Sequence, residues 1–238
     1  AIAAAVETEQ FNGVWVGVDT ISIPGHGSVD ETTGTVIYQE NENELFLYDP
    51  LLPALRLIKS GSSWILPSPI DVNYMGSPAR LTSVIITFQG ESRLTGLVTL
   101  EAEGLGASAT LNHSKYNCQT LKNGSSLLGL SGDADSARCY QIDFPSRASD
   151  LNIRTWGGLG DSDLYLIYHK PDFDEYSSEN YGNQEEIALA APHAGRWYAI
   201  LYGFDSYSGV NLATSYVDPA SKPRPTTMPW IPLLLFEE

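Results

Sequence analysis

The stretch Cys139-Tyr-Gln-Ile-Asp-Phe144 carries the pattern that decides the fold. Large apolar side chains stand at every second position, Tyr140, Ile142 and Phe144, and the positions between them are a cysteine and two polar residues. Successive side chains of a β-strand point to opposite faces, so this pattern predicts a strand with one buried and one outward face. Cys139 falls on the outward face. The strand is expected to end at Pro145, which cannot donate to a sheet.

The rest of the chain repeats this kind of pattern in short runs of β-branched and aromatic residues separated by Gly, Pro, Asn, Asp and Ser. Such runs at close spacing predict an all-β protein, and an antiparallel meander curls into a barrel or sandwich because open sheet edges invite aggregation. The strands predicted in the first half are Val14–Ile23, Thr35–Gln39, Glu44–Tyr48, Leu55–Lys59, Ile70–Tyr74, Leu81–Phe88, Leu94–Glu101 and Ala107–Asn112. Those predicted in the second half are Cys139–Phe144, Asp150–Trp156, Asp163–Tyr168, Glu186–Leu189, Arg196–Gly203 and Val210–Tyr216.

The 238 residues are enough for two domains of roughly 100 to 120 residues each. We predict an antiparallel β-barrel or sandwich over residues 1–112, a polar linker over 113–125 and a β-sandwich over 126–217. The remaining segment, 218–238, is rich in proline, which excludes a helix or a central strand there. It closes with Trp230-Ile-Pro-Leu-Leu-Leu-Phe236, and so apolar a run is expected to dock on a domain or on a neighbouring chain.

The charge balance excludes some classes of partner. Twenty-nine acidic residues against 13 basic ones give a net charge of −16, which repels the phosphate backbone of a nucleic acid. No run approaches the roughly 18 apolar residues of a membrane span, so we predict none.

The chain has two cysteines, Cys118 and Cys139. One interpretation is a disulfide, which would add about 3 kcal/mol of stability and requires an oxidising compartment. The other is two independent thiols. Because Cys139 points outward from its strand, the cysteine in the linker could reach it, and we predict the disulfide.

Five motifs follow one another in the second half: Leu127-Leu-Gly-Leu-Ser-Gly132, Cys139-Tyr-Gln-Ile-Asp-Phe-Pro145, Gly157-Gly-Leu-Gly-Asp-Ser-Asp-Leu-Tyr-Leu166, Ala194-Gly-Arg-Trp-Tyr-Ala-Ile-Leu-Tyr-Gly203 and Tyr207-Ser-Gly-Val-Asn-Leu212. With them, the region from about Ser126 to Tyr216 resembles the bacterial pre-peptidase C-terminal (PPC) domain of many secreted proteases, which is similar in fold to the collagen-binding domains of clostridial collagenases. The resemblance implies a jelly-roll β-sandwich that is secreted, periplasmic or on the cell surface of a bacterium. In the first half, Gly13-Val-Trp15 alone resembles lipocalin-like barrels.

The resemblance also implies which side chains face outward. It buries Trp197, Ala199 and Leu201, which turns the alternate positions to the outer face. The predicted outer patch, called the tyrosine patch below, consists of Tyr165, Ile167, Tyr198, Ile200 and Tyr202. Tyrosines suit binding because they give contact area and a hydroxyl at low entropic cost. The patch is therefore either an open face for an extracellular polymer or protein surface, or a surface that the N-terminal domain or the tail covers.

A calcium site is the one cofactor that the resemblance implies. Collagen-binding relatives bind calcium through acidic residues of the preceding linker and aspartates near the first strand, where this chain has Asp133 and Asp135. The linker 113–125 contains no carboxylate, so solvated turn residues are the competing interpretation.

Candidate catalytic residues are scarce. The chain has four histidines, with neither the HExxH spacing of a metalloprotease nor a Gly-x-Ser-x-Gly elbow. We therefore predict a non-enzymatic exported binding or adhesion protein. The alternative is a secreted hydrolase with a catalytic N-terminal half, of which a glycosidase acting through two carboxylates is an example.

Overall fold

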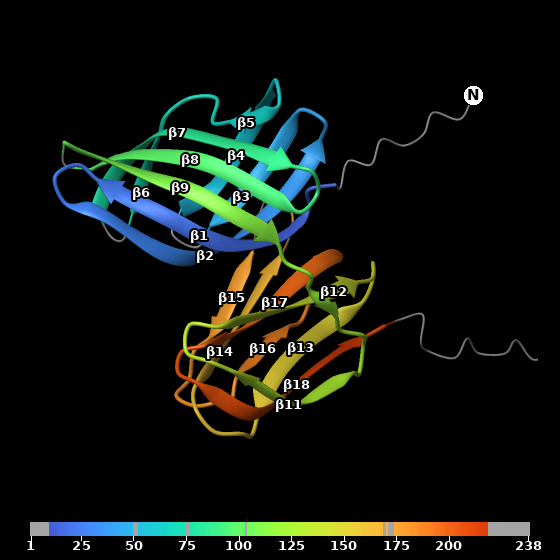
Figure 1. Ribbon diagram of the computed structural model, residues 1–238. Helices are drawn as coiled ribbons and strands as arrows, with labels where there is room; N and C mark the ends of the chain where they lie inside the picture. Colours follow the sequence, from blue (N-terminus) through green and yellow to red (C-terminus); the bar gives the residue numbers. More distant parts are fainter. Residues whose placement is uncertain are drawn as a thin grey trace, which may run out of the picture.

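The computed structural model describes residues 10–49, 52–74, 77–102, 104–168, 170 and 174–218. Every regular element in these ranges is a β-strand, which confirms the all-β prediction (Figure 1). The two regions at the chain ends, 1–9 and 219–238, lie outside the described residues. The predicted docking of the apolar tail concerns the second of these regions and therefore also lies outside the described residues.

The first nine strands form one antiparallel sheet that closes on itself. Pairing of β1 with β9 and of β5 with β7 completes an eight-stranded barrel, and β6 is attached to β7. The barrel alternative, rather than the sandwich, is therefore the one adopted. The strands are β1 (Gly13–Ile23), β2 (Gly27–Asn41), β3 (Glu44–Asp49), β4 (Leu52–Ser60), β5 (Ser63–Ile65), β6 (Ile70–Tyr74), β7 (Ser77–Gln89), β8 (Arg93–Ala102) and β9 (Leu105–Lys115).

The barrel interior is filled by alternate residues of these strands. Trp15 and Trp64 are among its largest side chains, and neither is more than 2% exposed. The seam between β1 and β9 depends on Gly17, because a Cβ at this position would lie 2.1 Å from the backbone oxygen of Asn112.

The remaining strands form the predicted sandwich of two sheets. One sheet has the order β10-β12-β17-β14-β15 and the other the order β11-β18-β13-β16. Tyr140, Ile142 and Phe144 point into the core between them, as the alternation predicts. The strands are β10 (Gln119–Thr120), β11 (Ser126–Gly132), β12 (Ala137–Phe144), β13 (Ser149–Trp156), β14 (Ser162–Tyr168), β15 (Glu175–Ser178), β16 (Glu186–Leu189), β17 (Gly195–Gly203) and β18 (Tyr207–Val217).

The connection between the two units is shorter than the linker predicted over 113–125. The strand β9 continues through Lys115, and β10 begins at Gln119. Leu121 is 3% exposed and belongs to the core of the sandwich. The polar composition of this segment is misleading. Residues 113–115 still pair as part of β9, and Gln119 and Thr120 of the edge strand β10 face water while their backbones pair with β12.

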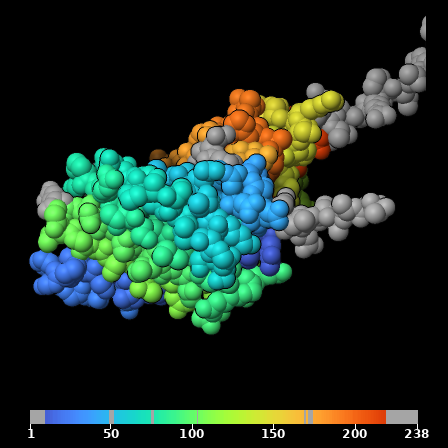
Figure 2. All heavy atoms as spheres, turned by 90° about the horizontal axis from the view of Figure 1, so that it is seen from above, coloured from blue at the N-terminus to red at the C-terminus, as the bar shows by residue number. Residues whose placement is uncertain are grey.

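The barrel lies over the outer face of the five-stranded sheet. Figure 1 shows β1 and β2 next to the sandwich, and Figure 2 shows orange and yellow atoms of the sandwich beyond the edge of the barrel. One cluster of buried side chains joins the two units: Val14 and Val36 from the barrel with Cys139, Ile167 and Tyr198 from the sandwich. Among the residues that the structure describes, no helix is long and apolar enough to cross a membrane.

Candidate functional site

The tyrosine patch of the sandwich faces the barrel. Its members come from β14 and β17, which pair in register so that Tyr165 lies opposite Ile200 and Ile167 opposite Tyr198. Ile167 is 3% exposed and Tyr198 is 2% exposed, because Val14 and Val36 of the barrel pack on this end of the patch. The barrel thus covers part of the patch, and Tyr165, Ile200 and Tyr202 are half-buried.

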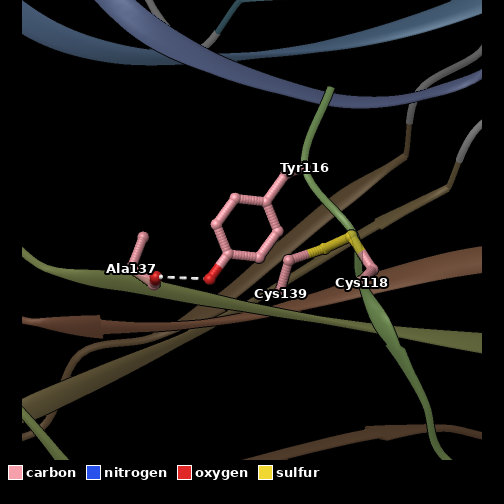
Figure 3. The surroundings of a disulfide bond; sticks show 4 residues. All are labelled: Tyr116, Cys118, Ala137 and Cys139. Atoms are coloured by element: carbon pink, nitrogen blue, oxygen red, sulfur yellow. Dashed lines mark hydrogen bonds between the residues drawn. A yellow bond between two sulfur atoms is a disulfide. The ribbon is translucent and has the colours of Figure 1, made fainter. Parts of the chain in front are cut away.

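A disulfide between Cys118 and Cys139 ties the connecting segment to β12, as predicted (Figure 3). Tyr116, two residues before Cys118, donates a hydrogen bond from its hydroxyl to the backbone oxygen of Ala137, 3.4 Å away. Cys139 is 6% exposed and packs in the cluster between barrel and sandwich. The crosslink therefore anchors the chain beside the interface, where it limits how far the two units can separate.

Beside the buried cluster, the barrel and the sandwich leave a cleft of about 360 Å³ between them, within the range of roughly 300–1,000 Å³ common for ligand pockets. Its walls are mostly apolar, with four tyrosines and three carboxylates. The barrel and the connecting segment contribute Val14, Val16, Glu31, Thr32, Thr33, Gly34, Val36, Tyr48 and Tyr116. The sandwich contributes Asp135, Ala137, Cys139, Tyr165, Ile167, Glu175, Ile200 and Tyr202.

Two tyrosines of the cleft are held by carboxylates. The Tyr202 hydroxyl donates to Asp135 Oδ1 at 2.7 Å, and this hydrogen bond together with burial raises the pKa of Tyr202 to about 12. The Tyr48 hydroxyl donates to Glu175, which joins β3 of the barrel to β15 of the sandwich. Burial, and then the nearby charge of Glu179, raises the pKa of Glu175 above its usual range. Both tyrosine rings are therefore fixed in the walls of the cleft.

Asp163 lies beside these walls on the outer face of β14, directly opposite Tyr202. Its carboxylate is in an unusual setting, since the residue is 6% exposed and its charged neighbours Asp161, Glu179 and Glu185 are all acidic. Burial and these like charges raise the pKa of Asp163 to about 6. A buried carboxylate among other carboxylates favours a cation nearby.

The two aspartates of the predicted calcium site occupy the turn before β12. Asp135 accepts the hydrogen bond of Tyr202, whereas the backbone oxygen of Asp133 accepts a hydrogen bond from the hydroxyl of Ser136 at 2.6 Å. Among the described residues, no three His, Cys, Asp or Glu side chains gather as a metal site would require. Calcium binding by Asp133 and Asp135 stays a prediction.

A buried network of polar side chains lies in the barrel at β1, β2 and β9. The ring of His113 contacts Asp19 Oδ1 at 2.7 Å through Nε2, and the Thr33 hydroxyl donates to Asp19 Oδ2 at 2.7 Å. His113 is 1% exposed and Asp19 is 6% exposed, so both lie out of reach of an external substrate. His26 is an exposed residue of the turn between β1 and β2.

Several residues of the cleft escape sequence reasoning, above all Glu31, Tyr48 and Tyr116. They line or flank the cleft because two domains meet there, and no short-range pattern reports such a contact. One signal was present on the barrel side. Leu45-Phe-Leu-Tyr48 is apolar on both faces, which is typical of a strand buried on both sides.

Comparison with known proteins agrees with this geometry for the sandwich. Residues 136–203 match the model of the bacterial pre-peptidase C-terminal domain, which confirms the resemblance to the PPC domain for this part of the chain. The match includes β12, β14 and β17, which form the sandwich wall of the cleft.

Three relatives share this region. The chain is 32% identical over 99 residues to alkaline serine exoprotease A of Vibrio alginolyticus, covering 40% of this chain and 18% of that protein. It is 36% identical over 104 residues to a microbial collagenase of Vibrio parahaemolyticus, covering 40% and 13%. It is 30% identical over 97 residues to a zinc metalloprotease of Helicobacter pylori, covering 40% and 38%. The chain thus spans well under half the length of each of these relatives.

Among solved structures, a Cry1Da tryptic core variant of Bacillus thuringiensis aligns over 86% of this chain and 51% of that one, at 10% identity. The TM-score of 0.26 is too low to indicate a shared fold.

Proposed function

We propose that this chain is a non-enzymatic, exported binding protein in which the barrel and the PPC domain hold a ligand in the cleft between them. The ligand belongs to an extracellular polymer or to the surface of a protein. The observation that carries this proposal is the cleft itself. It combines apolar walls with four tyrosines, two of which are fixed by carboxylates, and such rigid aromatic side chains are typical anchors of binding sites.

The relatives support an accessory role. The matched region makes up 18% of the exoprotease and 13% of the collagenase, so in those proteins it is a small module within a much longer chain. The disulfide supports export, because disulfides persist in oxidising compartments.

A hydrolase with a catalytic barrel is the alternative, and the names of the relatives favour it. The buried position of the Asp19–His113 pair weighs against it, since a catalytic acid–base pair must contact its substrate. Two of the three carboxylates that line the cleft, Asp135 and Glu175, accept hydrogen bonds from tyrosines and hold those rings in place, so binding is the function that this arrangement favours.

The test is capture by insoluble polymers. The full chain is incubated with insoluble collagen, chitin and cellulose, and the bound fraction is compared with that of a Tyr165→Ala/Tyr202→Ala variant. Removal of the two half-buried rings is expected to weaken capture by about tenfold or more, because aromatic anchors dominate binding energy. Soluble fragments released from the polymers are measured in parallel, and their release by the wild-type chain would favour the hydrolase instead.

The matched control is Tyr181→Ala/Phe204→Ala, which removes two aromatic rings from exposed loops of the sandwich. These side chains are 99% and 65% exposed. The control is expected to bind like the wild type. Loss of capture in the control but not in the cleft variant would move the binding surface to those loops and overturn the proposal.

A further inference from the structure

The charged side chains among the described residues that line the cleft are all acidic. Glu31, Asp135 and Glu175 line it, and none of the described residues in its lining is Lys, Arg or His. The chain as a whole is acidic, but the arrangement here is more specific than a general surface charge, because two of these carboxylates accept hydrogen bonds from tyrosines of the cleft.

Asp163 adds negative charge beside the cleft. It is not part of the lining and is 6% exposed, but it lies opposite Tyr202 and faces the same side of the sheet as Tyr165. None of the described residues is a partner of opposite charge for it, so its charge adds to the negative potential of the lining carboxylates.

The apolar walls of the cleft indicate which kind of positively charged ligand it can bind. Val14, Val16 and Val36 form one wall and Ile167 and Ile200 the other. A bare metal ion does not gain from such walls, and no three metal-ligating side chains converge among the described residues. A long side chain such as Lys or Arg does gain from them, because its methylene stem packs on apolar surface while its charged end reaches a carboxylate or a tyrosine ring.

We infer that the cleft takes a peptide segment of a partner protein that inserts a Lys or Arg side chain between apolar neighbours, with Glu31 and Glu175 of the lining as the acceptors of the charge. The inference rests on the proposed function and names its ligand class. The apolar residues of the peptide pack on the valine and isoleucine walls, and the tyrosine rings at 165 and 202 flank the cation.

The experiment uses fluorescein-labelled synthetic peptides and the full chain, with anisotropy read at about 0.15 M salt so that long-range charge is screened. One peptide alternates Leu with Lys, and its counterpart alternates Leu with Gln. The Lys peptide is expected to bind about tenfold or more tightly than the Gln peptide, since charge-assisted hydrogen bonds contribute roughly 1.5–3 kcal/mol.

Two double variants separate the cleft from the net charge. Glu31→Gln/Glu175→Gln removes two charges that line the cleft and is expected to weaken binding of the Lys peptide by about tenfold or more. Glu91→Gln/Glu101→Gln removes two charges from exposed positions of the barrel and is expected to change its affinity by less than about twofold.

Equal losses in both double variants, or equal binding of the two peptides, would overturn the inference. Sedimentation experiments test the other occupant. If the wild-type chain self-associates and Glu31→Gln/Glu175→Gln abolishes this, the inference is overturned, because the occupant of the cleft is then a second copy of the chain. If the peptides do not bind but polymer capture still depends on Tyr165 and Tyr202, the ligand class is wrong and the proposed function stands.

Discussion

Asp163 illustrates how the setting of a residue changes the behaviour of an ordinary side chain. The same carboxylate in a solvated turn would titrate near 4, but burial and the charges of Asp161, Glu179 and Glu185 raise its pKa to about 6. Such a group works against folding at neutral pH, because it binds a proton more tightly in the folded state than in the unfolded state. Destabilising charges of this kind are often kept at binding sites.

Asp163→Asn is expected to stabilise the protein at neutral pH. The pKa of the native group is raised, so its cost is absent below about pH 4, grows as the pH rises and is complete above about pH 6. The substitution should therefore raise the free energy of unfolding on the order of 1 kcal/mol at pH 7.5 and leave it nearly unchanged at pH 4.

Urea unfolding at the two pH values measures the difference. The control is Asp205→Asn, at an exposed position of the same domain. It should leave the free energy of unfolding unchanged at both pH values. A loss of stability at pH 7.5 in Asp163→Asn would mean that the carboxylate has a favourable partner.

At the scale of the elements, the turn before β14 depends on glycine. Gly160 has φ +93°, and a Cβ there would lie 2.1 Å from the backbone oxygen of Ser206. The turn therefore packs closely on the segment before β18. Because β14 carries Asp163, Tyr165 and Ile167, the geometry of this turn sets the position of one wall of the cleft.

Gly160→Ala is expected to destabilise the protein by more than about 3 kcal/mol, since it adds a steric clash to backbone strain. Gly182→Ala is the matched control, because Gly182 has a similar φ of +98° and no atom within 4 Å of the added Cβ. It should cost about 1–3 kcal/mol from strain alone. Thermal unfolding of the two variants compares these costs, and equal losses would show that the close approach to Ser206 contributes nothing.

For the whole molecule, the decisive contact is the one between barrel and sandwich. Tyr198 is 2% exposed between them, and Val14 and Val36 belong to the same buried cluster. The disulfide beside this cluster and the hydrogen bond from Tyr48 to Glu175 link the two units further. The cleft exists because these contacts hold its two walls at a set distance.

Tyr198→Ala is expected to lower the free energy of unfolding by about 2–4 kcal/mol, as large-to-small substitutions in buried clusters do. It should also increase the radius of gyration in small-angle X-ray scattering, because the two units separate about the connecting segment. Tyr202→Ala, a half-buried position on the same strand, should lose less stability and leave the scattering curve unchanged. Identical scattering of Tyr198→Ala and the wild type would show that the remaining contacts hold the units together.

Much of the fold could be predicted from the order of residues. The alternation of Tyr140, Ile142 and Phe144 indicated a strand with one buried face, and the positions of five motifs indicated the PPC domain. The outward direction of Cys139 made its disulfide with Cys118 a reasonable prediction. Short strands such as β5, β10 and β15 were missed because two to four residues are too few for a period to show.

The sequence by itself determined most of the longer strands, the sandwich of the second half and the disulfide, because each depends on which way neighbouring side chains point. The tertiary structure alone decided what covers Ile167 and Tyr198, where Tyr48 meets Glu175, and how deeply Asp163 is buried. The two residues of the Tyr48–Glu175 pair are 127 positions apart. Contacts over such distances arise when one folded unit packs on another, and the periodicity of a strand contains no information about its partner.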